Sequence, residues 1–215
     1  MTDTTAPPRD RSFEERKAEG TQVEWLMVDL LAAHGWTPFP TQIAWDAAGN
    51  NSPARAFGPD WEELWVPDID AQSPAPLHHR AAFDTKSKEP LSSGEFGWDA
   101  RSFSRAERWQ ERMRAPVVYA IRDRSIAPVP MGNRSGLDTL DPWIIASLHR
   151  LRMHKPWRMT NTFENEDGVR KEHTTYFWPR EVFSPLSDLL DGGFNIAPVL
   201  LRPTRIFGMG LGRLF

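Results

Sequence analysis

The first 123 residues of the chain contain two helical patterns and four short apolar runs, in the order helix, three apolar runs, helix, apolar run. The first helical pattern spans Phe13 to His34, where apolar side chains recur every three or four residues and Gly35 supplies a stop. The second spans residues 102–114. The apolar runs, which we predict to be strands, cover residues 36–45, 64–69, 80–86 and 116–121. This order predicts an α/β fold in which helices flank a mixed β-sheet.

Residues 126–215 give a weaker pattern. Asp141-Pro142 is typical of a helix start, so we predict a helix from there to about Met153. A hairpin is expected over residues 163–177, and a short helix over 185–190. The chain ends in a tail that is apolar but interrupted by glycine and proline. Together these elements predict an α+β extension that packs on the core or forms an interface.

Length and composition limit the class of protein. At 215 residues and 40% hydrophobic content, the chain has material for one main core. We expect a disordered lead-in over residues 1–16, a core over 17–125 and the extension over 126–215. The absence of cysteine excludes disulfides, thiolate zinc sites and cysteine nucleophiles. No apolar run approaches the roughly 18 residues of a membrane helix, and no signal core is present, so a cytoplasmic protein is expected.

One short motif carries most of the chemistry. Asp84-Thr85-Lys86 ends the apolar run of residues 81–83. Alternate side chains of a strand share a face, so Asp84 and Lys86 are expected to project together while Thr85 points away. A carboxylate can hold a divalent cation there, and the ammonium can orient a water or offset charge on phosphorus. An isolated Asp-x-Lys, however, is more often a pair of solvated side chains.

Basic and aromatic residues suggest a nucleic-acid partner. Four arginines of the second helical pattern form a candidate backbone-binding set: Arg101, Arg105, Arg108 and Arg112. Lys88 follows Lys86 at the same spacing and is a further candidate, although a surface lysine is an equal alternative. The net charge of −3 argues against a generally positive surface, so such binding would be local. Ten tryptophans, Trp157 among them, offer stacking platforms, although most tryptophans fill cores.

Three segments together resemble the PD-(D/E)xK nuclease superfamily, and most closely its archaeal-type Holliday-junction resolvase-like endonucleases. They are Glu24 within GTQVEWLMVDLLAAHGW, Pro67-Asp68-Ile69, and Phe83-Asp84-Thr85-Lys86-Ser87-Lys88. Members of the superfamily carry these motifs in this order, on a first helix, at the entrance to a strand and at the end of the next strand. The resemblance covers about residues 17–123 and implies a restriction-endonuclease-like core.

The resemblance also implies a role for each matching residue. Asp68 and Asp84 are expected to bind Mg²⁺ or Mn²⁺, with the carbonyl of Thr85 as a third oxygen. Lys86 is expected to position or activate the attacking water, and Glu24 to reach the site from the first helix. Asp70 lies two residues after Asp68 and shares its strand face, which leaves Asp70 as an alternative or additional ligand.

These expectations predict a metal-dependent nuclease that hydrolyses DNA phosphodiester bonds, as an endonuclease on branched or duplex DNA. Resolvases of this type act as symmetric pairs on a two-fold substrate, so a homodimer is expected. The alternative is a nuclease-like fold that binds without cleaving, as a structural module in a phage or defence assembly. The acidic balance of the chain and its apolar tail favour that alternative.

Overall fold

A computed structural model describes residues 13–42, 56–57, 63–75, 78–130, 137–164 and 170–191 of the chain. It begins with helix α1 (Phe13–Ala33), where a helix was predicted. The stop is also where it was expected. Gly35 has a φ of 80°, a left-handed conformation that glycine adopts without steric cost, and the chain then turns into the first strand.

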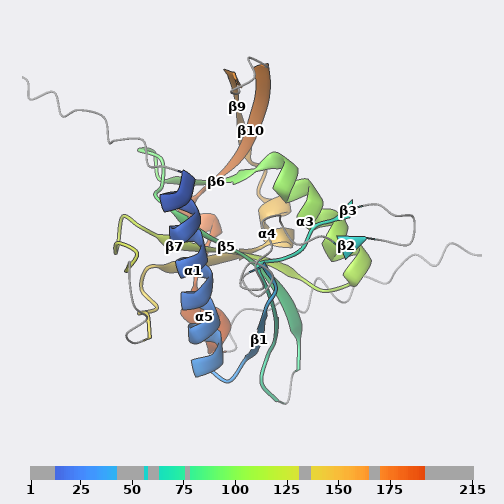
Figure 1. The fold of residues 1–215 in the computed structure, drawn as a ribbon, viewed down its shortest axis with the longest axis vertical. Coiled ribbons are helices and arrows are strands. Elements are labelled where there is room, and N and C mark those ends of the chain that lie inside the picture. Colours follow the sequence, from blue (N-terminus) through green and yellow to red (C-terminus); the bar gives the residue numbers. More distant parts are fainter. Residues whose placement is uncertain are drawn as a thin grey trace, which may run out of the picture.

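Six strands form the main sheet in the order β1-β4-β5-β7-β8-β11 (Figure 1). Neighbouring strands are antiparallel except for β5 and β7, which run parallel. The predicted mixed α/β class is therefore confirmed. The strands are β1 (Thr37–Pro40), β4 (Ile69–Gln72), β5 (Arg80–Lys88), β7 (Val117–Asp123), β8 (Trp143–Ser147) and β11 (Ser184–Pro185). A separate short pair consists of β2 (Ala56–Phe57) and β3 (Glu63–Leu64).

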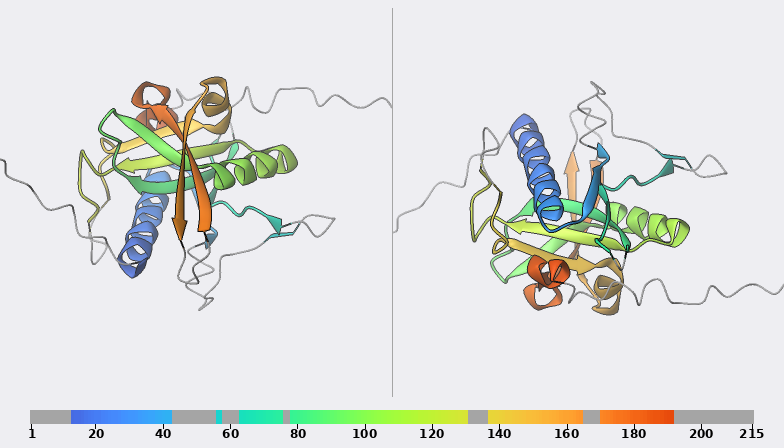
Figure 2. Two further views of the ribbon diagram at one scale, coloured as in Figure 1. Left: turned by 90° about the horizontal axis from the view of Figure 1, so that it is seen from above. Right: turned by 90° about the horizontal axis from the view of Figure 1, so that it is seen from below.

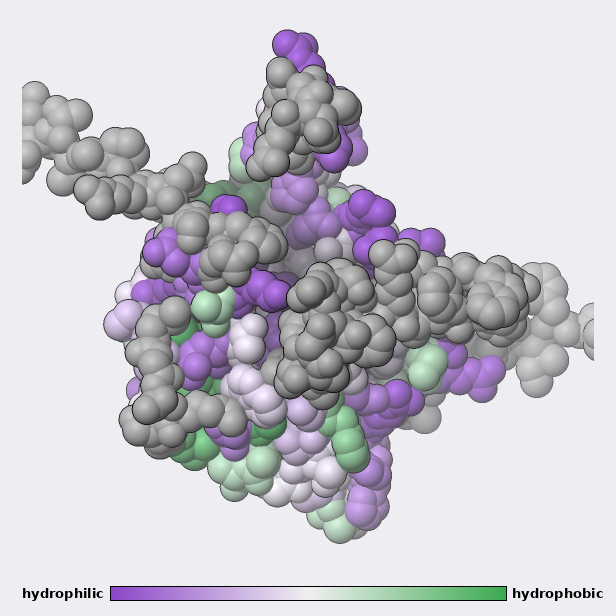
Figure 3. Space-filling model, viewed as in Figure 1, coloured by the Kyte–Doolittle hydropathy of each residue, from purple (hydrophilic) through white to green (hydrophobic). Residues whose placement is uncertain are grey.

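A second, antiparallel sheet has the order β6-β10-β9. It consists of β6 (Glu95–Asp99), β10 (Arg170–Pro179) and β9 (Trp157–Glu164). Only residues 175–179 of β10 pair with β6, while β9 follows β10 over residues 170–177. Beyond β6 the two strands continue as a ribbon that projects from the body of the molecule (Figure 1). The described part of this ribbon is largely hydrophilic (Figure 3).

Each face of the main sheet packs against its own hydrophobic core. On one face, α1 contributes Val23, Met27 and Leu30 against Phe83 of β5. On the other, the second sheet, α3 (Ala100–Met113), α4 (Leu148–Met153) and the 3₁₀ turn η1 (Arg180–Val182) pack around Tyr119. Helix α5 (Leu186–Leu190) joins the first core. Figure 2 shows α1 and α4 on opposite sides of the main sheet. These buried side chains each contribute about 1.5–3 kcal/mol to folding.

The structure corrects two predictions about elements. The segment after Asp141-Pro142 is not a helix: it forms strand β8, and α4 begins only at Leu148. All five residues of β8 are buried, so the sequence there lacks the alternation of apolar and polar residues that identifies a strand. Residues 95–99, for which no strand was predicted, form β6. The predicted hairpin and the short helix at 186–190 are both present. The tip of the hairpin, the lead-in up to residue 12 and the tail from residue 192 lie outside the described residues.

Part of the predicted extension belongs to the main sheet. Strand β8 pairs with β7, and β11 pairs with β8, so the proposed boundary at residue 125 falls between two neighbouring strands of one sheet. Within the described ranges, no helix combines the length and the hydrophobicity needed to span a lipid bilayer.

Candidate active site

The antiparallel pairing of β4 and β5 places Asp68 opposite Asp84. Ile69 is paired with Phe83, and the amide of Asp68 donates to the carbonyl of Phe83 at 3.0 Å. One step further along the pairing come the two acidic residues. The amide of Thr41 donates to the carbonyl of Asp68 at 3.0 Å, which holds the segment before β4 in place. The two carboxylates that the sequence placed on neighbouring strands therefore face the same region.

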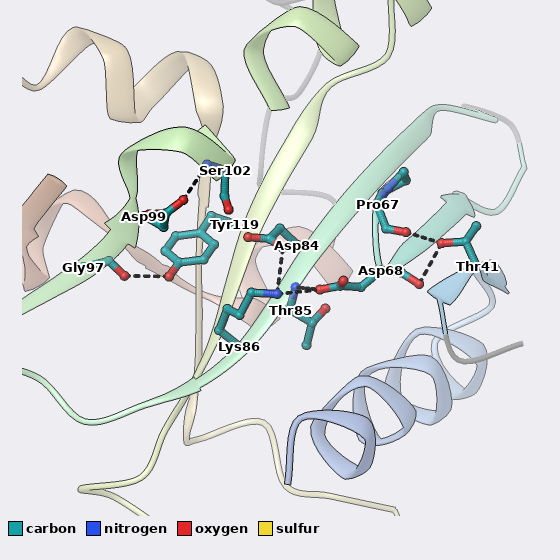
Figure 4. A network of polar contacts seen from close by, with 10 residues as sticks. All are labelled: Thr41, Pro67, Asp68, Asp84, Thr85, Lys86, Gly97, Asp99, Ser102 and Tyr119. Carbon is teal, nitrogen blue, oxygen red and sulfur yellow. Dashed lines mark hydrogen bonds and ion pairs between the residues drawn. The ribbon is translucent and has the colours of Figure 1, made fainter. Parts of the chain in front are cut away.

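Lys86 links these carboxylates. Its Nζ lies 2.9 Å from Oδ2 of Asp68 and 2.8 Å from Oδ1 of Asp84, and Figure 4 shows the ammonium between the two acids. Asp84 and Lys86 are two residues apart on β5, so their side chains lie on the same face, as predicted. The structure thus brings Asp68, Asp84 and Lys86 together.

The backbone of Thr85 completes the group. Its amide donates to Oδ2 of Asp68 at 2.7 Å. In a strand, the N–H and C=O of one residue point towards the same neighbour, so the carbonyl of Thr85 is also directed to the side of Asp68. The side chain of Thr85 is buried on the other face of the sheet from Asp84, as the alternation of the strand requires.

Burial makes the ionisation of Asp84 costly. Only 3% of this residue is exposed, and its Oδ2 has no hydrogen-bond partner in the part of the chain that is described. The pKa of Asp84 is raised to about 6. Burial is the largest cause, the charge of Lys86 partly opposes it, and the charge of Asp68 adds to it. Burial also lowers the pKa of Lys86, but Asp68 and Asp84 outweigh this and raise it well above its ordinary value. Lys86 is therefore a permanent cation at neutral pH.

Glu24 faces this group from α1. It is half-buried, and its negative charge contributes to the raised pKa of Lys86, after burial and the two aspartates. Among the predicted catalytic residues, Glu24 thus acts on the site through its charge.

Asp70 lies apart from this group. Its two carboxylate oxygens accept from Arg80, with Nε at 2.9 and 3.0 Å and Nη2 at 2.5 Å. The side chain of Arg80 is 45% exposed, so this pair sits at the surface. Of the two alternatives after Pro67, the geometry brings Asp68, and not Asp70, to Asp84 and Lys86.

The donors of the site fit a hard divalent cation. Two carboxylates and one backbone carbonyl are oxygen ligands of the kind that Mg²⁺ prefers, and Oδ2 of Asp84 is a buried oxygen without a partner. No three acidic or histidine side chains of the described ranges are grouped closely enough to bind a metal by themselves. An ion held here would take its other ligands from water and substrate, which suits Mg²⁺.

The predicted arginines lie along α3. Arg101, Arg105, Arg108 and Arg112 are spaced four, three and four residues apart, so they form one stripe, while Phe103, Ala106 and Trp109 face the core. Lys88 is half-buried near the end of β5. Burial lowers its pKa, and the charge of Lys86 lowers it further. No ion pair is formed by Arg101, Arg105, Arg108 or Lys88 with another described residue.

Sequence reasoning missed Tyr119 and Glu19. Tyr119 is the register partner of Asp84 on β7, stacks on Trp98 at 4.2 Å, and donates its hydroxyl to the carbonyl of Gly97 at 2.7 Å. Buried Glu19 of α1 accepts from the hydroxyl of Ser87 on β5. Glu19 could have been recognised from the sequence, because it lies one helical turn before Val23 and therefore on the buried side of α1. Tyr119 could not be recognised in this way, because parallel register cannot be read from a single strand.

Comparison with solved structures finds chains of similar fold. The chain is similar to Hjc from Archaeoglobus fulgidus, a Holliday junction resolvase from an archaeal hyperthermophile, with a TM-score of 0.44 and 12% sequence identity. The match covers 80% of this chain and 99% of that chain. No protein-family model and no curated protein sequence matches the chain.

Proposed function

We propose that this protein is a metal-dependent nuclease that hydrolyses DNA phosphodiester bonds, acting as an endonuclease on branched or duplex DNA. The observation that carries the proposal is the convergence of Asp68 and Asp84 on Lys86, beside the backbone of Thr85. An ion pair that served only stability would not need a second carboxylate buried with an unpartnered oxygen.

The charge of each residue of the candidate site determines its role in the proposed reaction. Asp68, Asp84 and the Thr85 carbonyl would hold Mg²⁺ or Mn²⁺, which supplies Lewis acidity towards the phosphoryl oxygen and the attacking water. Lys86 stays protonated, so it acts as a donor that orients the water or binds a phosphate oxygen, and not as the general base. Glu24 helps to keep that ammonium charged. The arginine stripe of α3 would bind the DNA backbone, independently of sequence.

A specific observation favours the alternative, a nuclease-like module that binds DNA without cleaving it. Lys86 already forms an ion pair with each carboxylate, and no third acidic or histidine side chain of the described residues joins them as a metal group. A metal would have to compete with that ammonium, and a buried group of ion pairs can be purely structural.

Cleavage assays separate the two functions. The purified protein is incubated with a four-way junction, a linear duplex and single-stranded DNA, each with Mg²⁺, with Mn²⁺ and with chelator. A nuclease cleaves at least one substrate only when metal is present. Replacing Asp84→Asn or Lys86→Ala should lower the rate at least about 100-fold, the scale of losing one electrostatic contact to the transition state.

Asp70→Asn is the matched control, because it removes a carboxylate of the neighbouring strand β4 that is paired with Arg80 outside the group. It should retain cleavage. Metal-dependent cleavage that survives both Asp84→Asn and Lys86→Ala would remove this site from the reaction. Binding without cleavage under every metal condition would establish the binding module.

A further inference from the structure

The antiparallel pair of β9 and β10 has two different faces. Tyr176 and Trp178 point inward, where both rings contact Phe103 of α3. Thr175 and Phe177, which alternate with them along β10, point to the outward face. Their partners on β9, Met159 and Trp157, share that face. On this outward face Trp157 is 43% exposed and Met159 37% exposed. A large indole is thus left in solvent on a regular strand, where nothing in the described structure covers it.

The exposed indole packs against a neighbouring ring. Trp157 stacks on Phe177 with ring centroids 4.5 Å apart and planes at 15°. The Phe177 ring in turn lies over Gly97 of β6, so close that a Cβ at Gly97 would be 2.7 Å from its Cε1 atom. The lower face of the indole is therefore filled by Phe177, and its ring plane is presented to solvent. This arrangement is a stacking platform and not a loosely attached side chain.

Two polar side chains accompany the platform. Lys171 and His173 follow along β10 on the outward face, and both are exposed. Glu172, between them, points to the opposite face. The imidazole of His173 lies 2.8 Å from the carboxylate of Asp99, which also caps α3 at Ser102. The outward face therefore combines an aromatic ring with a lysine ammonium and an imidazole, side chains of the kinds that bind a single nucleic-acid strand.

Strand β6 connects this face to the candidate active site. The carbonyl of Gly97, under Phe177, accepts from Tyr119, and Tyr119 is the register partner of Asp84. We propose that the outward face of the β6-β10-β9 sheet binds single-stranded DNA, with an unpaired base stacked on Trp157 and the backbone near Lys171 and His173. The choice of DNA rests on the proposed function. The surface would hold the unpaired strand of a branched substrate beside the cleavage site.

Binding of a short labelled oligo(dT), measured by fluorescence anisotropy in chelator, tests this surface. Trp157→Ala should weaken binding about 5- to 100-fold, the value of one base–aromatic stack. Trp157→Phe should retain most of the affinity because it keeps a ring on Phe177. Lys171→Gln should weaken binding and reduce its salt dependence. Met153→Ala is the matched control: Met153 is 68% exposed but lies at the end of α4, so its loss should change nothing.

A second readout guards against simple unfolding of the ribbon. An oligonucleotide carrying 2-aminopurine should lose fluorescence on binding the parent, because that base stacks, and should not lose it on binding Trp157→Ala. Oligo(dT) affinity that is equal in the parent, Trp157→Ala and Lys171→Gln overturns the inference. So does a parent that binds RNA or a second copy of itself through Trp157 but no DNA strand.

Measuring binding in chelator separates this inference from the proposed function. A parent that binds oligo(dT) through Trp157 but cleaves no substrate supports the platform and contradicts the nuclease. A parent that cleaves a junction with metal, while Trp157→Ala binds single strands as tightly as the parent does, supports the nuclease and contradicts the platform.

Discussion

A carboxylate in a nearly dry site is held in its ionised form only by its neighbours, and Asp84 depends on Lys86 for this. The ammonium lies 2.8 Å from one oxygen of Asp84, while the other oxygen has no partner among the described residues. The pKa of about 6 shows that the ammonium does not fully offset burial and the charge of Asp68. Asp84 is therefore a strained anion, as expected of a group that gains a stronger cation when metal and substrate bind.

The strain of Asp84 should appear as a pH dependence of stability. Its pKa is raised from 3.8 to about 6 in the folded protein, so the folded state holds the proton more tightly than the unfolded one. Stability from the protonated form is present below about pH 4 and is lost as pH rises to about 6. Asp84→Asn cannot titrate, so its stability relative to the parent should rise by about 2 kcal/mol between pH 4 and pH 7.

Urea unfolding of the parent and of Asp84→Asn across this range measures the difference. Asp70→Asn, at the exposed pair with Arg80, serves as the control and should show a much smaller change with pH. A stability difference between parent and Asp84→Asn that is constant from pH 4 to pH 7 would contradict the raised pKa.

A second ion pair is buried for a structural purpose. Arg122 on β7 is 2% exposed and donates to both oxygens of Asp138, at 2.7 and 3.1 Å. Asp138 also accepts from the indole of Trp143 at 2.8 Å. Asp138→Ala should destabilise the protein by about 3–5 kcal/mol, because it leaves a buried guanidinium without its partner. Chemical denaturation measures this loss. Asp70→Ala, which breaks the exposed pair with Arg80, should cost at most about 1 kcal/mol.

At the scale of elements, the periodicity of apolar residues and the residues that end helices decided what could be predicted. Helix α1 has a long apolar repeat and a glycine stop, and β5 ends in alternating charged residues, so both were found. In β8 all five residues are buried, so neither helical nor strand periodicity is visible, and Asp141-Pro142 favoured a helix. Trp143, Ile144 and Ile145 were the only β-type residues there. Strand β6 was missed because Gly97, which makes room for Phe177, is also typical of a loop.

The candidate site followed the same logic. Asp68, Asp84 and Lys86 were predictable because two short motifs on strands that pair in a hairpin must come together. The choice between Asp68 and Asp70 as the candidate metal ligand was not predictable in this way, because both lie on one face of the strand. It depended on Arg80, which pairs with Asp70 across the hairpin. Tyr119 and the support from β6 depend on register between distant segments, which local patterns do not contain.

Two glycines in different elements should respond oppositely to alanine. At Gly97 an added Cβ would be 2.7 Å from both Phe177 and Thr175, so Gly97→Ala should destabilise the protein by roughly 1–3 kcal/mol and displace the rings above it. At Gly20, in α1, nothing lies within 4 Å of the Cβ position. Gly20→Ala should stabilise the protein by about 0.5–1 kcal/mol. Thermal unfolding of both variants checks this, and equal effects would contradict the packing at Gly97.

The whole molecule is organised around a sheet that both cores share. Strand β8 places Trp143 and Ile145 in the core under α1, and Ile144 and Ala146 in the core around Tyr119. The nuclease-like motifs lie before residue 90, but the strand that completes the sheet beside β7 comes after residue 140. The candidate active-site group is thus supported by a segment that the sequence assigned to the C-terminal extension.

The shared strand leads to a prediction for fragments of the chain. A fragment ending at residue 125 keeps α1, β5, α3 and β7 but loses β8, so it exposes one edge of β7 and part of both cores. We expect it to be unfolded or aggregated, without a cooperative thermal transition by circular dichroism. A fragment ending at residue 191 keeps every described element and should unfold cooperatively near the temperature of the full chain. Cooperative unfolding of the 1–125 fragment would instead establish the resolvase-like core as a domain of its own. In that case the ribbon and β8 would be an addition to a core that is stable without them.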